Sequence, residues 1–168
     1  MITITTAEQT LIAQSKAIAR QWGFTYLSAP FLQDDSFFLQ LSPHQSGTQQ
    51  LQLQQNNKNS PGAIAVDFSS GQSAHRRLFG GGKGQTLAKA VGLNKTPLPV
   101  ILDATAGMGK DAFVFASLGA QVILMERSPI AAALLYDGLR RGLLDKEISE
   151  IIQRMTLIHG DTRLKIGR

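Results

Sequence analysis

The sequence has 168 residues, of which 43% are hydrophobic and 17% are charged, so it can form one domain with a small appended subdomain. This composition excludes wholesale disorder, and no run approaches the roughly 18 apolar residues of a membrane span. The sequence has no cysteine, which excludes disulfides and thiolate metal sites, and its start lacks the pattern of a secretory signal. We therefore expect a cytoplasmic protein with no membrane segment and no metal.

The net charge of +5 is unevenly distributed along the chain. Residues 1–70 carry 3 basic and 4 acidic side chains, whereas residues 71–168 carry 14 basic and 8 acidic ones. Lys and Arg side chains that neutralise phosphates supply most sequence-independent affinity for nucleic acids. The excess therefore favours a polyanionic partner such as RNA, with an ordinary solvated basic surface as the alternative.

The first 28 residues predict a strand followed by a helix. Residues 2–4 read as a short strand, and Thr6 can cap a helix over residues 7–21 that Gly23 ends. Trp22, Phe24 and Tyr26 follow at the helix exit. Aromatic rings can stack on bases, but at this position we favour a role in the core.

Residues 37–41 and 49–54 alternate in the manner of strands, and a third strand is predicted over residues 63–68. In residues 49–54, glutamines occupy one face and leucines the other, which is typical of a sheet with one wet face. Together with the helix, these strands predict a small N-terminal α+β subdomain, with an antiparallel sheet, over residues 1–70.

A basic, glycine-rich connector and a short helix are predicted over residues 71–96. The connector carries His75, Arg76, Arg77 and Lys83 around the run of glycines at 80–82. Guanidinium groups beside bare backbone can clamp a phosphate, so this segment is a candidate RNA contact. The alternative is a flexible connector with solubilising charges.

Residues 97–126 form the most informative stretch and predict a βαβ unit. The apolar run 100–102 ends in Asp103, a turn containing Gly107 and Gly109 follows, and helical spacing then leads to a second apolar run that ends in Glu126. Glycines let backbone approach a ligand at a helix N-terminus, and an acid about 20 residues later can accept from ribose hydroxyls. This pattern predicts a nucleoside-bearing cofactor, with a glycine turn used only for packing as the alternative.

After Glu126 the sequence predicts two helices and a third parallel strand. Ser128 and Pro129 make a good helix start for residues 130–139, and a further helix is predicted over residues 145–154. The third strand covers residues 155–159, and Gly160-Asp161-Thr162 forms its tip. Residues 97–168 therefore predict an incomplete Rossmann-like, cofactor-binding α/β domain.

The pattern of an acid followed by Gly-x-Gly resembles motif I of class I S-adenosyl-L-methionine-dependent methyltransferases. Six further blocks surround or contain this motif, namely Val66-Asp67-Phe68, Ala74-His75-Arg76-Arg77, Phe79-Gly80-Gly81-Gly82-Lys83-Gly84, Ala88-Lys89-Ala90-Val91-Gly92, Asp103-Ala104-Thr105-Ala106-Gly107 and Met125-Glu126-Arg127 with Pro129. Together these blocks resemble the small-subunit ribosomal RNA methyltransferase J family.

The resemblance implies transfer of a methyl group from S-adenosylmethionine to N2 of a guanosine near the 3′ end of 16S rRNA, in free RNA or in the small ribosomal subunit. It also implies cofactor contacts after each of the three strands. These contacts would come from Lys110, Asp111, Glu126, Arg127, Asp161 and Thr162. The last two positions depart from the family, in which two serines are expected.

The resembling family continues beyond the third strand with a motif that holds the target amine. We expect this chain to stop before that motif, so it offers no catalytic residue, and its oligomeric state is open. One alternative function is a non-catalytic RNA-binding or ribosome-assembly fragment. A weaker one is a nicotinamide-dependent oxidoreductase, in which an acid after the second strand serves equally well.

Overall fold

The computed structural model describes residues 2–28, 35–44, 47–70 and 86–161. The chain divides into two compact units, Met1–Val66 and Asp67–Arg168. No helix in the described ranges is long and apolar enough to cross a membrane. The predicted connector residues 71–85 lie outside the described part, while the short helix that follows them is present as α3 (Thr86–Ala90).

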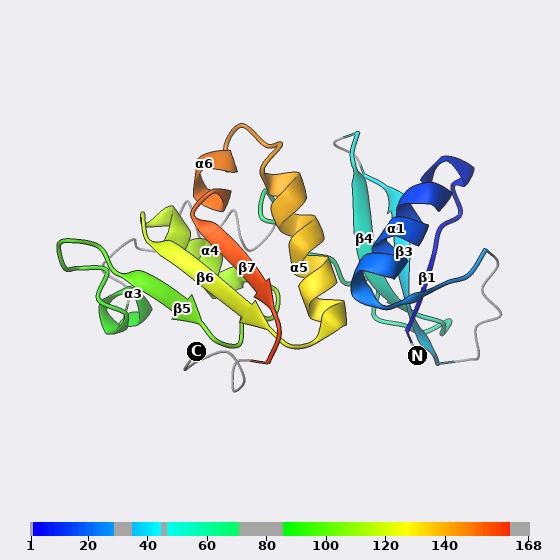
Figure 1. The fold of residues 1–168 in the computed structure, drawn as a ribbon, viewed down its shortest axis with the longest axis horizontal. Helices are drawn as coiled ribbons and strands as arrows, with labels where there is room; N and C mark the ends of the chain where they lie inside the picture. Colours follow the sequence, from blue (N-terminus) through cyan, green and yellow to red (C-terminus); the bar gives the residue numbers. More distant parts are fainter. Residues whose placement is uncertain (1, 29–34, 45–46, 71–85, 162–168) are drawn as a thin grey trace. The chain divides into compact units, whose positions relative to one another are not determined.

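The first unit is a four-stranded sheet with one helix (Figure 1). Its elements are β1 (Thr3–Thr5), the 3-10 helix η1 (Gln9–Leu11), α1 (Ile12–Trp22), β2 (Thr25–Tyr26), β3 (Phe37–Pro43) and β4 (Gln49–Gln55). The strand order is β2-β1-β3-β4, and the leucines at 39, 41 and 51 are buried with Ile4. The Leu and Gln alternation thus puts leucines in the core, as predicted.

Two sequence predictions for this unit are wrong. Strand β1 pairs in parallel with both β2 and β3, so the sheet is mixed, because α1 carries the chain back across before β2 begins. The third strand predicted over residues 63–68 is reduced to a single antiparallel bridge between Leu53 and Ile64. Residues beyond this bridge leave the sheet, since Asp67 and Phe68 belong to the second unit.

The helix of the first unit begins later than predicted. The Thr6 hydroxyl accepts a hydrogen bond from the Glu8 N–H at 3.1 Å, a local turn that precedes the 3-10 helix η1. The α-helix starts only at Ile12 and ends, as predicted, at Gly23, which adopts a left-handed conformation with φ 72°.

The second unit contains the predicted βαβ unit and the third strand. Its further elements are β5 (Val100–Asp103), α4 (Lys110–Ser117), β6 (Gln121–Glu126), α5 (Pro129–Gly142), α6 (Ser149–Ile152) and β7 (Met155–His159). The strands are parallel in the order β5-β6-β7. Short crossovers through α4 and α5 dictate this arrangement.

One face of this sheet is buried under helices (Figure 1). Ile101, Val122 and Leu124 lie on that face and are at most 8% exposed. On the opposite face, Val100 is 67% exposed and Leu102 is 45% exposed. Within the described residues, β5 is an edge strand, and the face of the sheet opposite the helices carries exposed apolar side chains there.

Helix α5 begins as predicted and α6 is shorter than predicted. The Ser128 hydroxyl accepts from the Ala131 N–H at 3.4 Å, and Pro129 occupies the first turn. Of the helix predicted over residues 145–154, only Ser149–Ile152 is α-helical. The preceding residues form a turn in which the Asp145 carboxylate accepts from the Glu147 N–H at 2.8 Å.

Candidate cofactor site

The parallel register places the carboxyl ends of β5 and β6 side by side. Asp103 pairs with Leu124, and β6 runs two residues further to Glu126, which is opposite His159 of β7. The chain leaves β5 through the turn at residues 104–109, and the Ala106 N–H donates to the Met125 carbonyl at 3.0 Å. This bond fixes the glycine turn against the end of β6.

Glu126 faces the glycine turn through its carboxylate. One oxygen accepts from the Gly107 N–H at 2.9 Å, and the other accepts from the Ser128 N–H at 2.7 Å. The side chain is half-buried. Two backbone donors therefore orient the carboxylate toward the turn, while each oxygen retains a lone pair for a further donor.

The two glycines of the turn have different surroundings. A Cβ at Gly107 would meet no described atom nearer than the Thr105 carbonyl oxygen at 3.9 Å, so the described residues leave room for a ligand beside this backbone. A Cβ at Gly109 would lie 2.8 Å from Leu135 and 3.3 Å from both Leu124 and Phe68. Both residues have positive φ, 52° and 69°. Gly107 thus fits a ligand approach, whereas Gly109 is required by packing, the role kept as an alternative for the turn.

The site is electrostatically negative around Asp103. Burial raises the pKa of this carboxyl, a hydrogen bond from the Thr105 N–H opposes the rise, and the charges of Asp111 and Glu126 reinforce it, so the pKa lies above its ordinary value. The Thr105 N–H donates to Asp103 at 3.2 Å. Three carboxylates that act on one another around a turn favour a cationic ligand group.

The other predicted site residues divide into those near the turn and those outside the described ranges. Lys110 and Asp111 are exposed residues of the first turn of α4, Arg127 is exposed after β6, and Asp161 is half-buried after β7. The Gly160 N–H donates to the Glu126 carbonyl at 2.9 Å, which brings the tip of β7 to the end of β6. The predicted residues outside the described ranges are Thr162, His75, Arg76, Arg77 and Lys83.

Sequence reasoning missed the support behind the turn. Phe68 is 2% exposed and stacks on Phe113 of α4 with ring centroids 4.9 Å apart, directly behind Gly109. Asp67 accepts from the Ser69 N–H and hydroxyl at 2.9 and 2.8 Å and from the Ser70 hydroxyl at 2.9 Å. An Asp followed two residues later by Ser is the sequence signal for such a turn.

A buried ion pair on α5 reaches the same segment. Arg141 and Asp137 lie 2.9 Å apart with 7% of each side chain exposed. Partial burial alone raises the pKa of Asp67, but the hydrogen bonds from Ser69 and Ser70 and the charge of Arg141 outweigh it, so the pKa lies below its ordinary value. The charge of Arg141 on α5 thus acts on Asp67, while the neighbouring Phe68 packs behind the glycine turn.

Comparison with known proteins identifies the family. A family model described as "Putative SAM-dependent methyltransferase" matches residues 18–166. The chain therefore belongs to this family of S-adenosylmethionine-dependent methyltransferases.

Curated relatives named "Ribosomal RNA small subunit methyltransferase J" match most of the chain. The Pseudomonas fluorescens protein is 51% identical over 148 residues, covering 88% of this chain and 55% of that protein. The Aliivibrio salmonicida protein is 50% identical over 151 residues, covering 89% and 54%. These relatives confirm the resemblance predicted from the sequence blocks. The chain spans about half the length of the curated relatives it matches.

A solved structure confirms the fold class. The crystal structure of a SAM-dependent methyltransferase from Neisseria gonorrhoeae superposes with a TM-score of 0.73 at 32% identity, covering 97% of this chain and 62% of that one. The cofactor that the family implies is S-adenosylmethionine. Three features of the site fit this ligand, which carries an adenosyl sulfonium, a ribose and an ammonium group. They are the space beside the Gly107 backbone, the carboxylate of Glu126 and the negative surroundings of Asp103.

Proposed function

We propose that this chain supplies the S-adenosylmethionine-binding part of a methyltransferase that modifies N2 of a guanosine near the 3′ end of 16S rRNA. The observation that carries the proposal is the Glu126 carboxylate held against the Gly107 N–H at 2.9 Å, where two parallel strands end. The names of the relatives supply the substrate class. The proposed cellular location is the cytoplasm.

Each carboxylate around the turn has a proposed task. The Glu126 oxygens, oriented by the Gly107 and Ser128 N–H groups, accept hydrogen bonds from the ribose hydroxyls. Asp103 and Asp111 favour the positively charged end of the ligand. When bound, S-adenosylmethionine supplies an electrophilic methyl group on its sulfonium sulfur.

The flanking residues complete the proposed site. The proposed contacts at the rim of the site come from Lys110, Arg127, Asp161 and Thr162. The basic residues His75, Arg76, Arg77 and Lys83 are proposed to contact the RNA phosphates, because charged donors clamp phosphate oxygens well. Transfer to an amine depends mainly on positioning of the target base.

Two experiments test this function. Titration calorimetry is expected to detect binding of S-adenosylmethionine but not of NAD, and Glu126→Ala is expected to weaken binding. Transfer of a labelled methyl group to unmodified small subunits is expected to fail when the target guanosine is replaced by inosine, which lacks the exocyclic amine. Labelling that persists on inosine would refute the N2 assignment. RNA retention without labelling would identify a binding protein instead.

A further inference from the structure

The first unit contains a groove that the cofactor site does not use. It lies between α1 and β2 and has a volume of about 610 Å³, within the range of roughly 300–1,000 Å³ typical of ligand pockets. Its lining includes the buried Ala19, the half-buried Phe24 and Tyr26, and the exposed Lys16 and Arg20. Of the described residues that line it, two are aromatic, two are basic and none is acidic.

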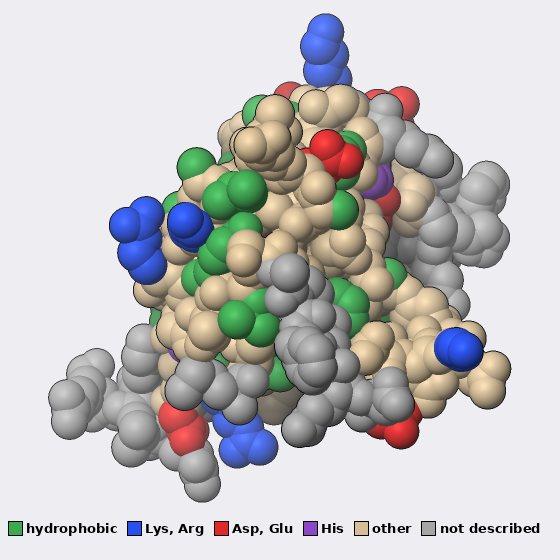
Figure 2. Space-filling model, turned by 90° about the vertical axis from the view of Figure 1, so that its right-hand side faces the viewer, with side chains coloured by type: hydrophobic (Ala, Val, Ile, Leu, Met, Phe, Trp, Pro, Cys, Tyr) green, Lys and Arg blue, Asp and Glu red, His purple; other side chains and the backbone are tan. Residues whose placement is uncertain are grey.

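Basic side chains are more concentrated at this groove than in the rest of the first unit. Residues 1–66 carry three basic side chains, Lys16, Arg20 and Lys58, and three acidic ones, so the unit has no net charge. Two of the three basic side chains lie at the groove, one helical turn apart on the exposed face of α1. Figure 2 shows basic side chains next to hydrophobic ones on the face that it draws. The groove therefore complements an anion that also carries apolar surface.

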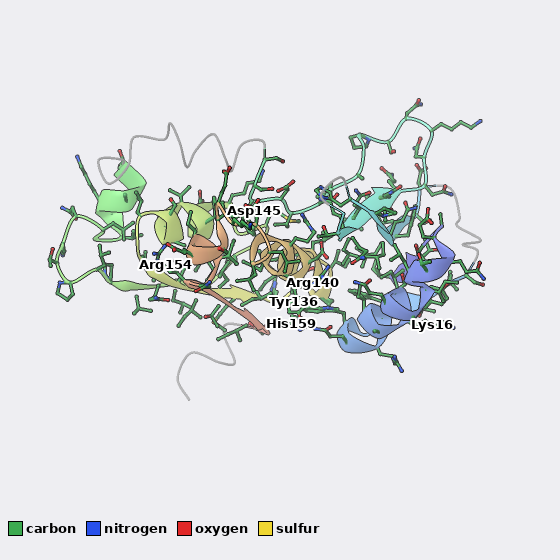
Figure 3. The ribbon with its side chains drawn as sticks, turned by 90° about the horizontal axis from the view of Figure 1, so that it is seen from above. Lys16, Tyr136, Arg140, Asp145, Arg154 and His159 are labelled. Atoms are coloured by element: carbon green, nitrogen blue, oxygen red, sulfur yellow. The ribbon has the colours of Figure 1, made fainter. Side chains whose placement is uncertain are left out.

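The aromatic side chains give the groove a second property. Tyr26 and Phe24 are half-buried, and the Lys16 ammonium lies 5.4 Å from the centre of the Tyr26 ring (Figure 3 labels Lys16 on α1). A cation over an aromatic ring near solvent is a weak attraction, so the flexible, exposed lysine can exchange the ring for a phosphate. A ring beside two phosphate-seeking cations is the arrangement that binds single-stranded nucleic acid, in which bases are free to stack on protein.

We propose that the α1–β2 groove binds a short single-stranded segment of the RNA substrate. Bases stack on Tyr26 and Phe24, and Lys16 and Arg20 contact the flanking phosphates. The proposal rests on the proposed function only for the identity of the RNA. The first unit would then hold the substrate, while the second unit holds the cofactor.

Binding of a fluorescein-labelled oligouridylate, followed by anisotropy at several salt concentrations, tests the groove. Lys16→Gln is expected to weaken binding and to reduce the salt slope by about one. Tyr26→Leu is expected to weaken binding by about 5-fold or more, whereas Tyr26→Phe, which keeps the ring, is expected to retain it. Lys58→Gln removes the same charge outside the groove and is the matched control, with unchanged affinity expected.

A second measurement needs no variant. Irradiation of the parent chain with a bromouridine-substituted oligonucleotide is expected to crosslink the tryptic peptide that follows Arg20 and contains Phe24 and Tyr26. Crosslinks confined to other peptides would overturn the proposal. The proposal would also be overturned if the folded Lys16→Gln and Lys58→Gln variants bound the RNA with equal affinity. It would be overturned as well if polyglutamate, a polyanion without bases, displaced the labelled RNA as effectively as unlabelled RNA does. Circular dichroism verifies that each variant is folded.

The groove variants also separate this proposal from the proposed function. Titration of S-adenosylmethionine is expected to give the same affinity for the parent chain, Lys16→Gln and Tyr26→Leu, because the groove and the cofactor turn belong to different units. If the parent chain bound RNA at the groove but did not bind S-adenosylmethionine, only the proposed function would be refuted. Intact cofactor binding with no RNA bound at the groove would refute only the groove.

Discussion

Alanine substitutions at the two glycines of the turn are expected to differ in their effects on stability and on cofactor affinity. Gly109→Ala places a Cβ 2.8 Å from Leu135 Cδ1, an overpacking that costs about 1–3 kcal/mol, and the positive φ adds about 1–2 kcal/mol. Gly107→Ala has only the cost of positive φ, because the nearest described atom to its Cβ, the Thr105 carbonyl oxygen, lies at an ordinary contact distance of 3.9 Å. We therefore expect losses in the free energy of unfolding of about 2–5 and 1–2 kcal/mol, respectively.

The affinity for the cofactor is expected to depend more on Gly107 than on Gly109. The Gly107 Cβ would occupy the space through which a ligand reaches the backbone, so affinity for S-adenosylmethionine falls at least about tenfold, or 1.4 kcal/mol. Gly109→Ala, while folded, is expected to bind with a smaller loss. Urea unfolding followed by circular dichroism and titration calorimetry on both variants provide the comparison. Equal stability losses, or stronger cofactor binding by Gly107→Ala than by Gly109→Ala, would refute the division of roles.

Three further outcomes follow from the second unit. Glu126→Gln keeps the shape of the side chain but replaces one carboxylate oxygen, which accepts, with an NH2 group that faces a backbone N–H donor. Calorimetry should therefore detect at least about tenfold weaker cofactor binding, and unchanged affinity would contradict this expectation. Arg141→Ala should lower the free energy of unfolding, measured in urea, by about 3 kcal/mol, because it removes the buried partner that lies 2.9 Å from the buried Asp137 carboxylate. Arg140→Ala is the control and should cost under about 1 kcal/mol, because 37% of the Arg140 side chain is exposed. The raised pKa of Asp103 means that the folded chain holds its proton after the unfolded chain has released it, so this residue destabilises as pH rises above about 3.9. Asp103→Asn should therefore gain stability over the parent between pH 3 and pH 7, and a constant difference across that window would contradict the assignment.

The βαβ unit could be predicted from the sequence because its signals are local. The apolar runs that end at Asp103 and Glu126 became β5 and β6, and the cap at Ser128 starts α5. In a parallel unit, adjacent strands necessarily end at the same edge, so the proximity of Glu126 to Gly107 followed from topology. Gly23 ended α1 for an equally local reason.

Features that depend on contacts distant in sequence could not be predicted. The packing role of Gly109 is set by Phe68 and Leu135, and no spacing rule connects these residues. The parallel pairing of β1 was missed because alternation indicates a strand but not its partner. The bonds from the Gly107 and Ser128 N–H groups to Glu126 depend on the exact path of the folded backbone, since the sequence indicates only that the carboxylate is near.

The central claim is that the turn between β5 and α4 holds the adenosyl cofactor with the help of Glu126. The most direct test is the change in backbone amide resonances on addition of S-adenosylmethionine to the isotopically labelled chain. We predict that the amides of Gly107 and Ser128, which donate to Glu126, shift strongly, while that of Gly23 in the first unit does not. Saturation with no change at Gly107 and Ser128 would contradict the account.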